Sequence, residues 1–136
     1  LSNNFDYVSN TINPTFPDGL DVEVFSFKTL LETYRNAKKL SEKEHVTPYI
    51  KNSNNFQIGS YENNENLSLE RWTIDYEVDF TLISSIFNYF YPNIYFTMND
   101  ILEYKKYNPN IFNINKGIKR NEGSKLSNKK KKISLN

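Results

Sequence analysis

The fold depends first on the stretch Phe16-Pro17-Asp18-Gly19-Leu20-Asp21-Val22-Glu23-Val24-Phe25-Ser26-Phe27, which combines a turn, a strand and the start of a helix. Pro17 fixes its own φ and Gly19 can adopt a positive φ, so the sequence predicts a tight turn here. The residues after the turn alternate in character, which predicts a strand that buries Val22 and Val24 on one face.

The opposite face of this predicted strand, residues 21–25, carries two carboxylates, Asp21 and Glu23. They stand about 7 Å apart, because a strand rises roughly 3.3 Å per residue. Two interpretations are open: the acids lie on a solvated face, or they line the floor of a polar pocket. The pattern alone favours the solvated face.

Composition excludes several classes of chemistry. With 136 residues the chain is long enough for one domain with a core of its own. It has no cysteine and one histidine, His45, which excludes disulfides, thiolate chemistry and sites with several histidine ligands. The absence of cysteine favours a reducing, cytoplasmic location, and no apolar run is long enough to predict a membrane span. Because the sequence begins with Leu1 rather than Met, we expect a piece of a longer protein.

Charge divides the chain into an acidic body and a basic tail. Residues 1–115 contain fifteen of the sixteen Asp/Glu, whereas residues 116–136 contain eight of the seventeen Lys/Arg. The tail has almost no apolar side chains, so we expect it to be disordered. Its lysines could attract nucleic acid or anionic lipid, but no aromatic residue accompanies them to read bases, which does not favour nucleic-acid binding.

Periodicity and caps predict the other elements. The expected strands and helices alternate along the chain, which indicates an α/β fold with a partly parallel sheet. The expected strands are 5–9, 21–25, 56–58 and the second half of 67–74, and the expected helices are 27–40, a short or kinked one from Ser41 through Tyr49, 77–90 and 98–107.

Three blocks resemble one enzyme family. They are residues 17–27, then Glu44-His45-Val46-Thr47-Pro48-Tyr49-Ile50, then Arg71-Trp72-Thr73-Ile74-Asp75. In this order they resemble the cytidylyltransferases of spore-coat and surface polysaccharide synthesis, relatives of the CMP-Kdo and CMP-sialic acid synthetases. The resemblance covers residues 5–90 well and 91–115 loosely. It implies a nucleotide-diphospho-sugar transferase fold, a Rossmann-like mixed sheet flanked by helices, of which residues 1–115 form the C-terminal, acceptor-side half.

The resemblance also implies a reaction. In such enzymes a sugar hydroxyl attacks the α-phosphate of CTP, pyrophosphate leaves, and a CMP-sugar forms for polysaccharide or glycan synthesis. Mg²⁺ is the implied cofactor, because the charge on the phosphates must be neutralised during transfer. The implied partners are CTP, a sugar (an acidic one included) and a second copy of the chain. The family's N-terminal half, with its Gly- and Arg-rich triphosphate loop, has no counterpart here, so we expect this chain alone to be inactive.

Five residues take roles from the resemblance. Asp75 matches an aspartate that holds the metal, and Asp21 and Glu23 match the strand that lines the acceptor-sugar pocket. His45 and Arg71 lie in matching blocks and are candidate catalytic residues, the first as a general base and the second as a ligand for phosphate or an acidic sugar.

One departure from the family lies directly after Asp75. Relatives continue with Thr-Pro-Glu-Asp, whereas this chain has Tyr76-Glu77-Val78-Asp79. Only Asp79 is therefore retained from that part of the motif.

Each candidate also has a purely structural interpretation. Asp75 is a favoured residue type for a helix N-cap after a strand. Arg71 could form a salt bridge with Glu70 or Glu77, and His45 could be a packed or capping residue. The aromatic residues of the 77–90 helix fit either a core or a subunit contact. The alternative function is therefore a non-catalytic module for dimerisation or sugar binding, or a remnant of the enzyme.

Overall fold

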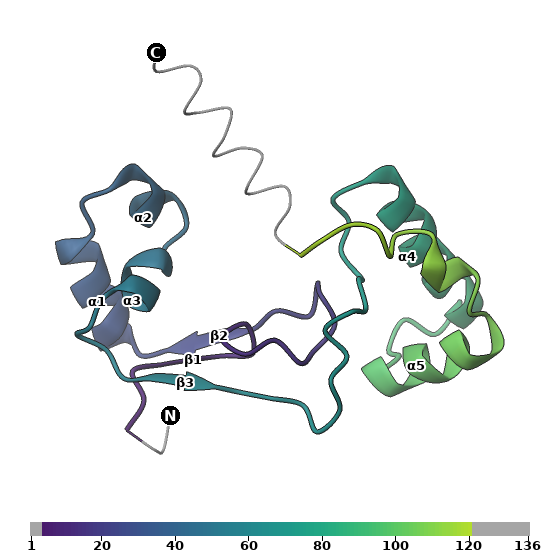
Figure 1. Ribbon diagram of the computed structural model, residues 1–136, viewed down its shortest axis with the longest axis horizontal. Coiled ribbons are helices and arrows are strands. Elements are labelled where there is room, and N and C mark those ends of the chain that lie inside the picture. The colour runs from purple at the N-terminus through teal and green to yellow at the C-terminus, as the bar shows by residue number, and fades with distance from the viewer. Residues whose placement is uncertain (1–3, 121–136) are drawn as a thin grey trace, which may run out of the picture. The chain divides into compact units, whose positions relative to one another are not determined.

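The computed structural model describes residues 4–120, which form two compact units. Within the described residues, the first unit comprises 4–16 and 21–67, and the second comprises 17–20 and 68–120. Each unit contains its own cluster of buried hydrophobic side chains. We therefore describe each unit by itself (Figure 1).

The first unit is built on a small mixed sheet of three strands, β1 (Tyr7–Ser9), β2 (Glu23–Phe25) and β3 (Ile58–Ser60). The strand order is β2-β1-β3, with β2 antiparallel and β3 parallel to β1. Tyr7 is the register residue, because it lies opposite Phe25 on one side and Ile58 on the other. The expected α/β fold with a partly parallel sheet is confirmed.

Three short helices lie together at one end of these strands in Figure 1: α1 (Phe27–Asn36), α2 (Leu40–Glu44) and α3 (Pro48–Asn52). As expected, the Ser26 side chain caps α1 by accepting a hydrogen bond from the Thr29 amide. The helix expected from Ser41 through Tyr49 is instead divided into α2 and α3. Pro48 is the reason, because it occupies the first turn of α3, where its missing N–H costs nothing.

The face assignment of β2 from the sequence was wrong. Val22 and Val24 are 58% and 49% exposed, and the strand begins only at Glu23. Side chains alternate along a strand, so Glu23 and Phe25 share the other face. That face is the inner one, because Phe25 stacks on the fully buried Tyr7 with ring centroids 6.1 Å apart.

The second unit contains α4 (Glu77–Phe90), α5 (Met98–Tyr107) and a 3₁₀ turn, η1 (Ile111–Asn113). Both long helices have the bounds expected from the sequence, and the Thr97 side chain caps α5 together with Asp100. The core of this unit is formed by six buried hydrophobic residues: Trp72, Leu82, Ile86, Ile101, Tyr104 and Phe112.

The strand expected in the second half of 67–74 is absent from the described structure. This segment makes a single bridge, between Arg71 and Asp18 of the turn at 17–20. The turn approaches so closely that a Cβ on Gly19, whose φ is +105°, would lie 2.5 Å from the Trp72 carbonyl oxygen. The segment therefore packs against a turn rather than inside a sheet.

The basic tail lies mostly outside the described residues. Residues 121–136, on which most of the disorder prediction rests, are not described. Residues 116–120 are described, and the Arg120 guanidinium lies 3.5 Å from the Asp18 carboxylate. In the part of the chain that the structure covers, no helix is long and apolar enough to cross a membrane.

Candidate active site

A buried arginine organises the polar centre of the second unit. Arg71 is 6% exposed, and its guanidinium donates to three carboxylates. Nη1 donates to Asp18 at 3.0 Å, Nη2 to Asp75 at 3.0 Å, and Nε and Nη2 together hold both oxygens of Asp79 at 3.0 and 2.8 Å. We call the residues that meet here the Arg71 cluster: Asp18, Arg71, Thr73, Asp75, Asp79, Asn115 and Arg120.

Asp79 is the buried anchor of this cluster. Its side chain is fully buried, and besides Arg71 it accepts hydrogen bonds from Thr73 at 3.0 Å and Asn115 at 2.8 Å. Burial on its own raises the pKa of the Asp79 carboxyl. The hydrogen bonds from Arg71 and Asn115 outweigh burial and hold the pKa of Asp79 well below its ordinary value, so the group is ionised.

The start of α4 explains why Asp79 occupies this position. Its carboxylate also accepts the backbone N–H groups of Asp75 and Tyr76, both at 3.2 Å, and thereby satisfies donors at the helix N-terminus. Tyr76, and not Asp75, is the N-cap residue. The interpretation of Asp75 as the N-cap of this helix is therefore wrong.

Asp75 is the exposed member of the cluster. The side chain of Asp75 is 65% exposed, whereas that of Asp18 is 10% exposed and that of Asp79 is fully buried. The cluster contains three carboxylates and the two guanidiniums of Arg71 and Arg120. Because Asp75 is by far the most exposed of the three carboxylates, it is the one that a cation from solvent can reach most readily.

The salt-bridge interpretation of Arg71 was correct in kind and wrong in its partners. Glu70 pairs with Lys105 of α5 instead. The carboxylates that bind Arg71 come from the 17–20 turn and from the segment that leads into α4. Their attraction raises the pKa of Arg71 against the opposing effect of burial.

The described residues offer a partial metal site only. Among residues 4–120 no group of three or more Asp, Glu, His or Cys side chains is placed to hold a metal ion. Mg²⁺ is commonly bound through one or two carboxylates together with water and substrate phosphates. Asp75 fits a single contributed ligand of that kind, and the Mg²⁺ cofactor stays a prediction.

Glu23 has structural partners in the first unit. Its Oε1 accepts hydrogen bonds from Tyr7 at 2.7 Å and Thr47 at 3.1 Å, and Lys51 of α3 pairs with it at 2.5 Å. Burial raises the pKa of the Glu23 carboxyl, but Lys51 and Tyr7 together lower it below its ordinary value. Glu23 therefore ties β2 to α3 through an ionised carboxylate.

The other two candidates of the first unit are exposed. Asp21 precedes β2, and His45 is the C-cap residue of α2, which agrees with its interpretation as a capping residue. Val46, the next residue, has a φ of +60°, and the Thr47 amide donates to the His45 carbonyl at 2.6 Å. A β-branched residue with positive φ is an outlier that the surrounding structure must enforce.

The structure thus brings Arg71 and Asp75 into contact, while Asp21, Glu23 and His45 belong to the other unit. The assigned roles of all five in sugar binding, catalysis and metal binding stay predictions.

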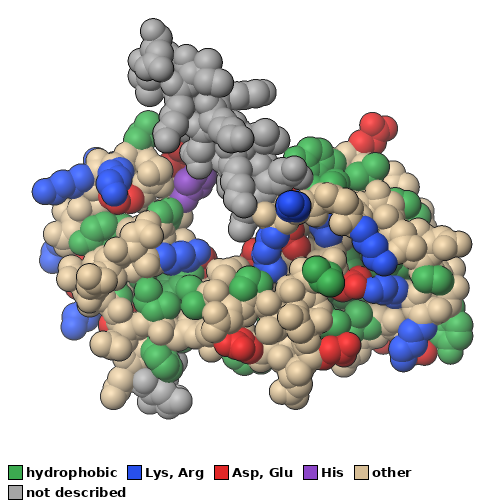
Figure 2. Space-filling model, viewed as in Figure 1, with side chains coloured by type: hydrophobic (Ala, Val, Ile, Leu, Met, Phe, Trp, Pro, Cys, Tyr) green, Lys and Arg blue, Asp and Glu red, His purple; other side chains and the backbone are tan. Residues whose placement is uncertain are grey.

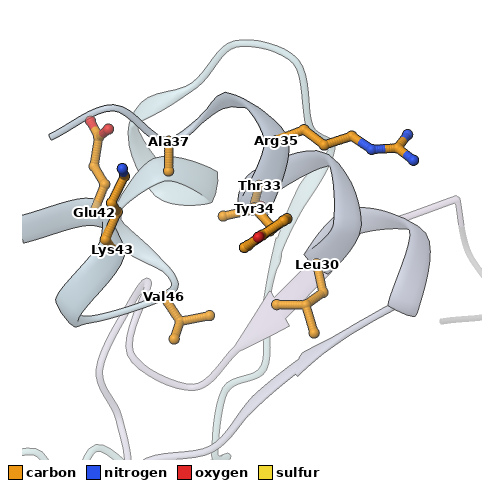
Figure 3. Close-up of a pocket in the computed structure, with 8 residues that line it drawn as sticks. All are labelled: Leu30, Thr33, Tyr34, Arg35, Ala37, Glu42, Lys43 and Val46. Atoms are coloured by element: carbon orange, nitrogen blue, oxygen red, sulfur yellow. The ribbon is translucent and has the colours of Figure 1, made fainter. Parts of the chain in front are cut away.

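A separate pocket of about 490 Å³ lies between α1 and α2 in the first unit. Figure 3 shows Leu30 and Val46 facing each other across it, with the Tyr34 ring nearby and the Arg35 guanidinium pointing away. None of the five candidate site residues lines this pocket.

Sequence reasoning missed four members of the Arg71 cluster: Asp18, Thr73, Asn115 and Arg120, the last of which was interpreted only as part of the basic tail. Asp18 was interpreted only as part of a turn, although an acid in a Pro-Asp-Gly turn is a readily placed counter-ion. Thr73 carried no separate signal within its block. Asn115 lies in an Asn-rich region whose composition gives no local indication that this residue alone is 2% exposed.

The small mixed sheet with flanking helices agrees with a nucleotidyltransferase-like fold, because a solved protein of that class has a similar structure. A solved structure, a cytidylyltransferase from Leptospira borgpetersenii serovar Hardjo-bovis, matches with a TM-score of 0.74 and 29% sequence identity, over 81% of this chain and 46% of that one. The uncharacterized protein MJ1063 of Methanocaldococcus jannaschii is 41% identical over 123 residues, which are 88% of this chain and 49% of that protein. The chain thus spans about half the length of each. No protein-family model matches the chain.

Proposed function

We propose that this chain is the acceptor-side, C-terminal half of a sugar cytidylyltransferase of the spore-coat and surface polysaccharide type. The reaction transfers CMP from CTP to a sugar hydroxyl: the oxygen forms a bond to the α-phosphorus, the bond to the β-phosphate oxygen breaks, and pyrophosphate leaves. The similarity to a solved cytidylyltransferase and the three sequence blocks support this proposal.

The observation that carries the proposal is the exposed carboxylate of Asp75, held by a buried arginine that two further acids already satisfy. Asp75 would contribute one oxygen to Mg²⁺, and the remaining ligands would be water and phosphate oxygens. When bound, Mg²⁺ supplies neutralisation of the phosphate charge. In this proposal the role of Arg71 is to orient the carboxylate of Asp75, to which its guanidinium donates a hydrogen bond.

The residues of the first unit would serve the acceptor sugar. The carboxylate of Asp21 and the second oxygen of Glu23 would accept hydrogen bonds from sugar hydroxyls. His45, exposed at the end of α2, would be the general base.

The chain alone would not turn over CTP. It corresponds to about half of the proteins that it resembles, and it contains four glycines and no glycine-rich loop to hold a triphosphate. Activity is therefore proposed for the complete gene product, in which the same polypeptide supplies the N-terminal, CTP-binding half.

A second candidate function is a non-catalytic dimerisation module, and the surface of the second unit favours it. Five large aromatic side chains of α4 and the following segment are at least half exposed: Phe80, Phe87, Tyr89, Tyr91 and Tyr95. Figure 2 shows hydrophobic side chains on the visible surface of the molecule. A homodimer through this surface is compatible with catalysis, so it serves both candidates.

The experiment that tests the enzyme proposal is pyrophosphate release from the complete gene product. The protein is offered CTP with Mg²⁺ and a panel of neutral and acidic sugars, with ATP, GTP and UTP as matched controls. The proposal requires release that depends on CTP, on Mg²⁺ and on one of the sugars. If no pyrophosphate is released with any sugar of the panel and any of the four nucleotides, the non-catalytic module is left as the function.

A further inference from the structure

We infer that Asn115 is a positioning residue of the proposed site: its amide fixes the Arg71 guanidinium and, through it, the carboxylate of Asp75. The inference rests on the proposed function, because it is there that the position of Asp75 matters. Asn115 itself would touch neither substrate nor metal.

Asn115 contacts the backbone of Arg71 directly and its guanidinium through Asp79. Its Nδ2 donates to the Arg71 backbone carbonyl at 3.0 Å and to Asp79 Oδ1 at 2.8 Å. Both partners are acceptors only, so the side-chain amide must present its NH₂ group to them. Asn115 is 2% exposed, so these two hydrogen bonds are shielded from bulk solvent.

Asp79 passes this restraint on to the guanidinium. Its Oδ1, which accepts from Asn115, also accepts from Arg71 Nε at 3.0 Å, and its Oδ2 accepts from Nη2 at 2.8 Å. A guanidinium is planar and rigid, so two fixed bonds along one edge determine the direction of every other N–H. The remaining hydrogen of Nη2 then points to Asp75 Oδ2, 3.0 Å away.

The segment that carries Asn115 is itself anchored. It follows η1, where Phe112 is buried in the core of the second unit with its ring 5.8 Å from that of Tyr104. Further along, Arg120 pairs with Asp18, a second carboxylate of the cluster. The segment after α5 therefore holds the Arg71 cluster from outside the sequence block in which Arg71 and Asp75 lie.

The substitution Asn115→Leu removes both hydrogen bonds and keeps a side chain of similar length. Arg71 and Asp79 remain paired, so the cluster persists, but the Asp79 carboxylate and the Arg71 backbone each lose one of the hydrogen bonds that hold them in place. Asn113→Leu is the matched control, because Asn113 is an exposed asparagine in the same segment, two positions away.

The direct test is nuclear magnetic resonance of the ¹⁵N-labelled arginine side chains in the 136-residue chain. In Asn115→Leu, hydrogen exchange at Arg71 Nε–H and rotation about its Nε–Cζ bond should both accelerate about tenfold or more, because Asp79 Oδ1, the acceptor of that N–H, loses its hydrogen bond from Asn115. Asn113→Leu should leave both rates unchanged. If Asn115→Leu does not fold, Asn115→Ser undergoes the same measurement.

A second measurement separates this inference from the proposed function. In the complete gene product, Asn115→Leu should lower kcat about tenfold and leave the KM for CTP unchanged, and Asn115→Gln, which retains an amide, should recover part of the loss. Unchanged Arg71 rates, or a lower melting temperature with unchanged kcat, would overturn the inference. Altered Arg71 rates in a chain whose wild-type complete product releases no pyrophosphate would support the coupling and refute the proposed function instead.

Discussion

The carboxylate of Asp79 is ionised in a position that solvent does not reach, and its neighbours determine how much it contributes to the stability of the chain. Its two oxygens accept hydrogen bonds from two nitrogens of Arg71, from Thr73 and Asn115, and from two backbone N–H groups. A buried ion pair of this kind is costly to break, because the remaining charge is left without a partner. Asp75 is paired with the same arginine, but it is exposed, so breaking its ion pair does not carry this cost.

Neutralising Asp79 should therefore destabilise the chain far more than neutralising Asp75. We expect Asp79→Asn to lower the free energy of unfolding by about 3–5 kcal/mol, since it breaks the buried two-point ion pair with Arg71 and places an NH₂ group among donors that need an acceptor. Asp75→Asn should cost no more than about 1 kcal/mol, the usual range for a solvent-exposed pair. Urea denaturation at pH 7 measures both, and equal losses would contradict the assignment of Asp79 as the anchor.

The lowered pKa of Asp79 predicts a dependence of stability on pH. In the unfolded chain the pKa of an aspartate is about 3.9, and in the folded chain that of Asp79 is lower, so the unfolded state binds more protons. The contribution of Asp79 is complete above about pH 4 and is lost as the pH falls further. The free energy of unfolding, measured from pH 6 to pH 2, should fall less steeply in Asp79→Asn than in the wild type, and parallel curves would contradict the assignment.

Among the elements, the 17–20 turn positions the cluster through its backbone. The Asp18 amide donates to the Glu70 carbonyl at 2.8 Å, and the Trp72 amide donates to the Asp18 carbonyl at 2.7 Å. The turn can come this close because Gly19 has a positive φ and no side chain. Asp18 is thereby brought to Arg71 across a separation of 53 residues.

Adding a methyl group to this turn should be costly. We expect Gly19→Ala to lower the free energy of unfolding by more than about 1 kcal/mol, because φ is positive there and the new Cβ would collide with the Trp72 carbonyl. Gly117→Ala is the control, since nothing lies within 4 Å of its Cβ position. Thermal denaturation compares the two, and a Gly19→Ala variant as stable as the control would mean that the turn does not pack as described.

How far the elements could be predicted depended on whether their signals were local. The helices α4 and α5 were predicted with their bounds, because apolar periodicity and the Thr97 cap lie within each helix. The inner face of β2 was not predicted, because the position of Glu23 on that face depends on its pairing with Lys51, which lies in a helix 28 residues further along the chain. Alternation alone is the same for either choice of face.

The candidate site was predicted in part for the same reason. Arg71 and Asp75 lie four residues apart in one block, and the structure brings them into contact. Asn115 and Asp18 come from segments 44 and 53 residues away from Arg71, so their contribution follows from tertiary packing alone. No pattern within the sequence distinguishes Asn115 from the exposed asparagines beside it.

At the scale of the whole molecule, exposed aromatic side chains suggest a role in assembly. We expect the complete gene product to be a homodimer through the aromatic surface of the second unit, and Phe80→Arg on α4 to convert it to a monomer, because a buried unpaired charge opposes association. Tyr34→Arg is the matched control, as Tyr34 is an exposed aromatic on α1 of the other unit, 82% exposed against 60% for Phe80. Sedimentation velocity measures the mass, and a monomeric wild type would refute the dimer.

The central claim is that Asp75, held in place by Arg71, binds a divalent cation for nucleotidyl transfer. The measurement that tests it most directly is Mg²⁺-dependent pyrophosphate release by Asp75→Asn in the complete gene product. Glu103→Gln is the control, because Glu103 is likewise an exposed carboxylate that pairs with a basic residue, Lys106 of the same helix. The account predicts that Asp75→Asn loses activity about a hundredfold or more with its melting temperature nearly unchanged, while Glu103→Gln keeps it. Wild-type activity in Asp75→Asn would contradict the account.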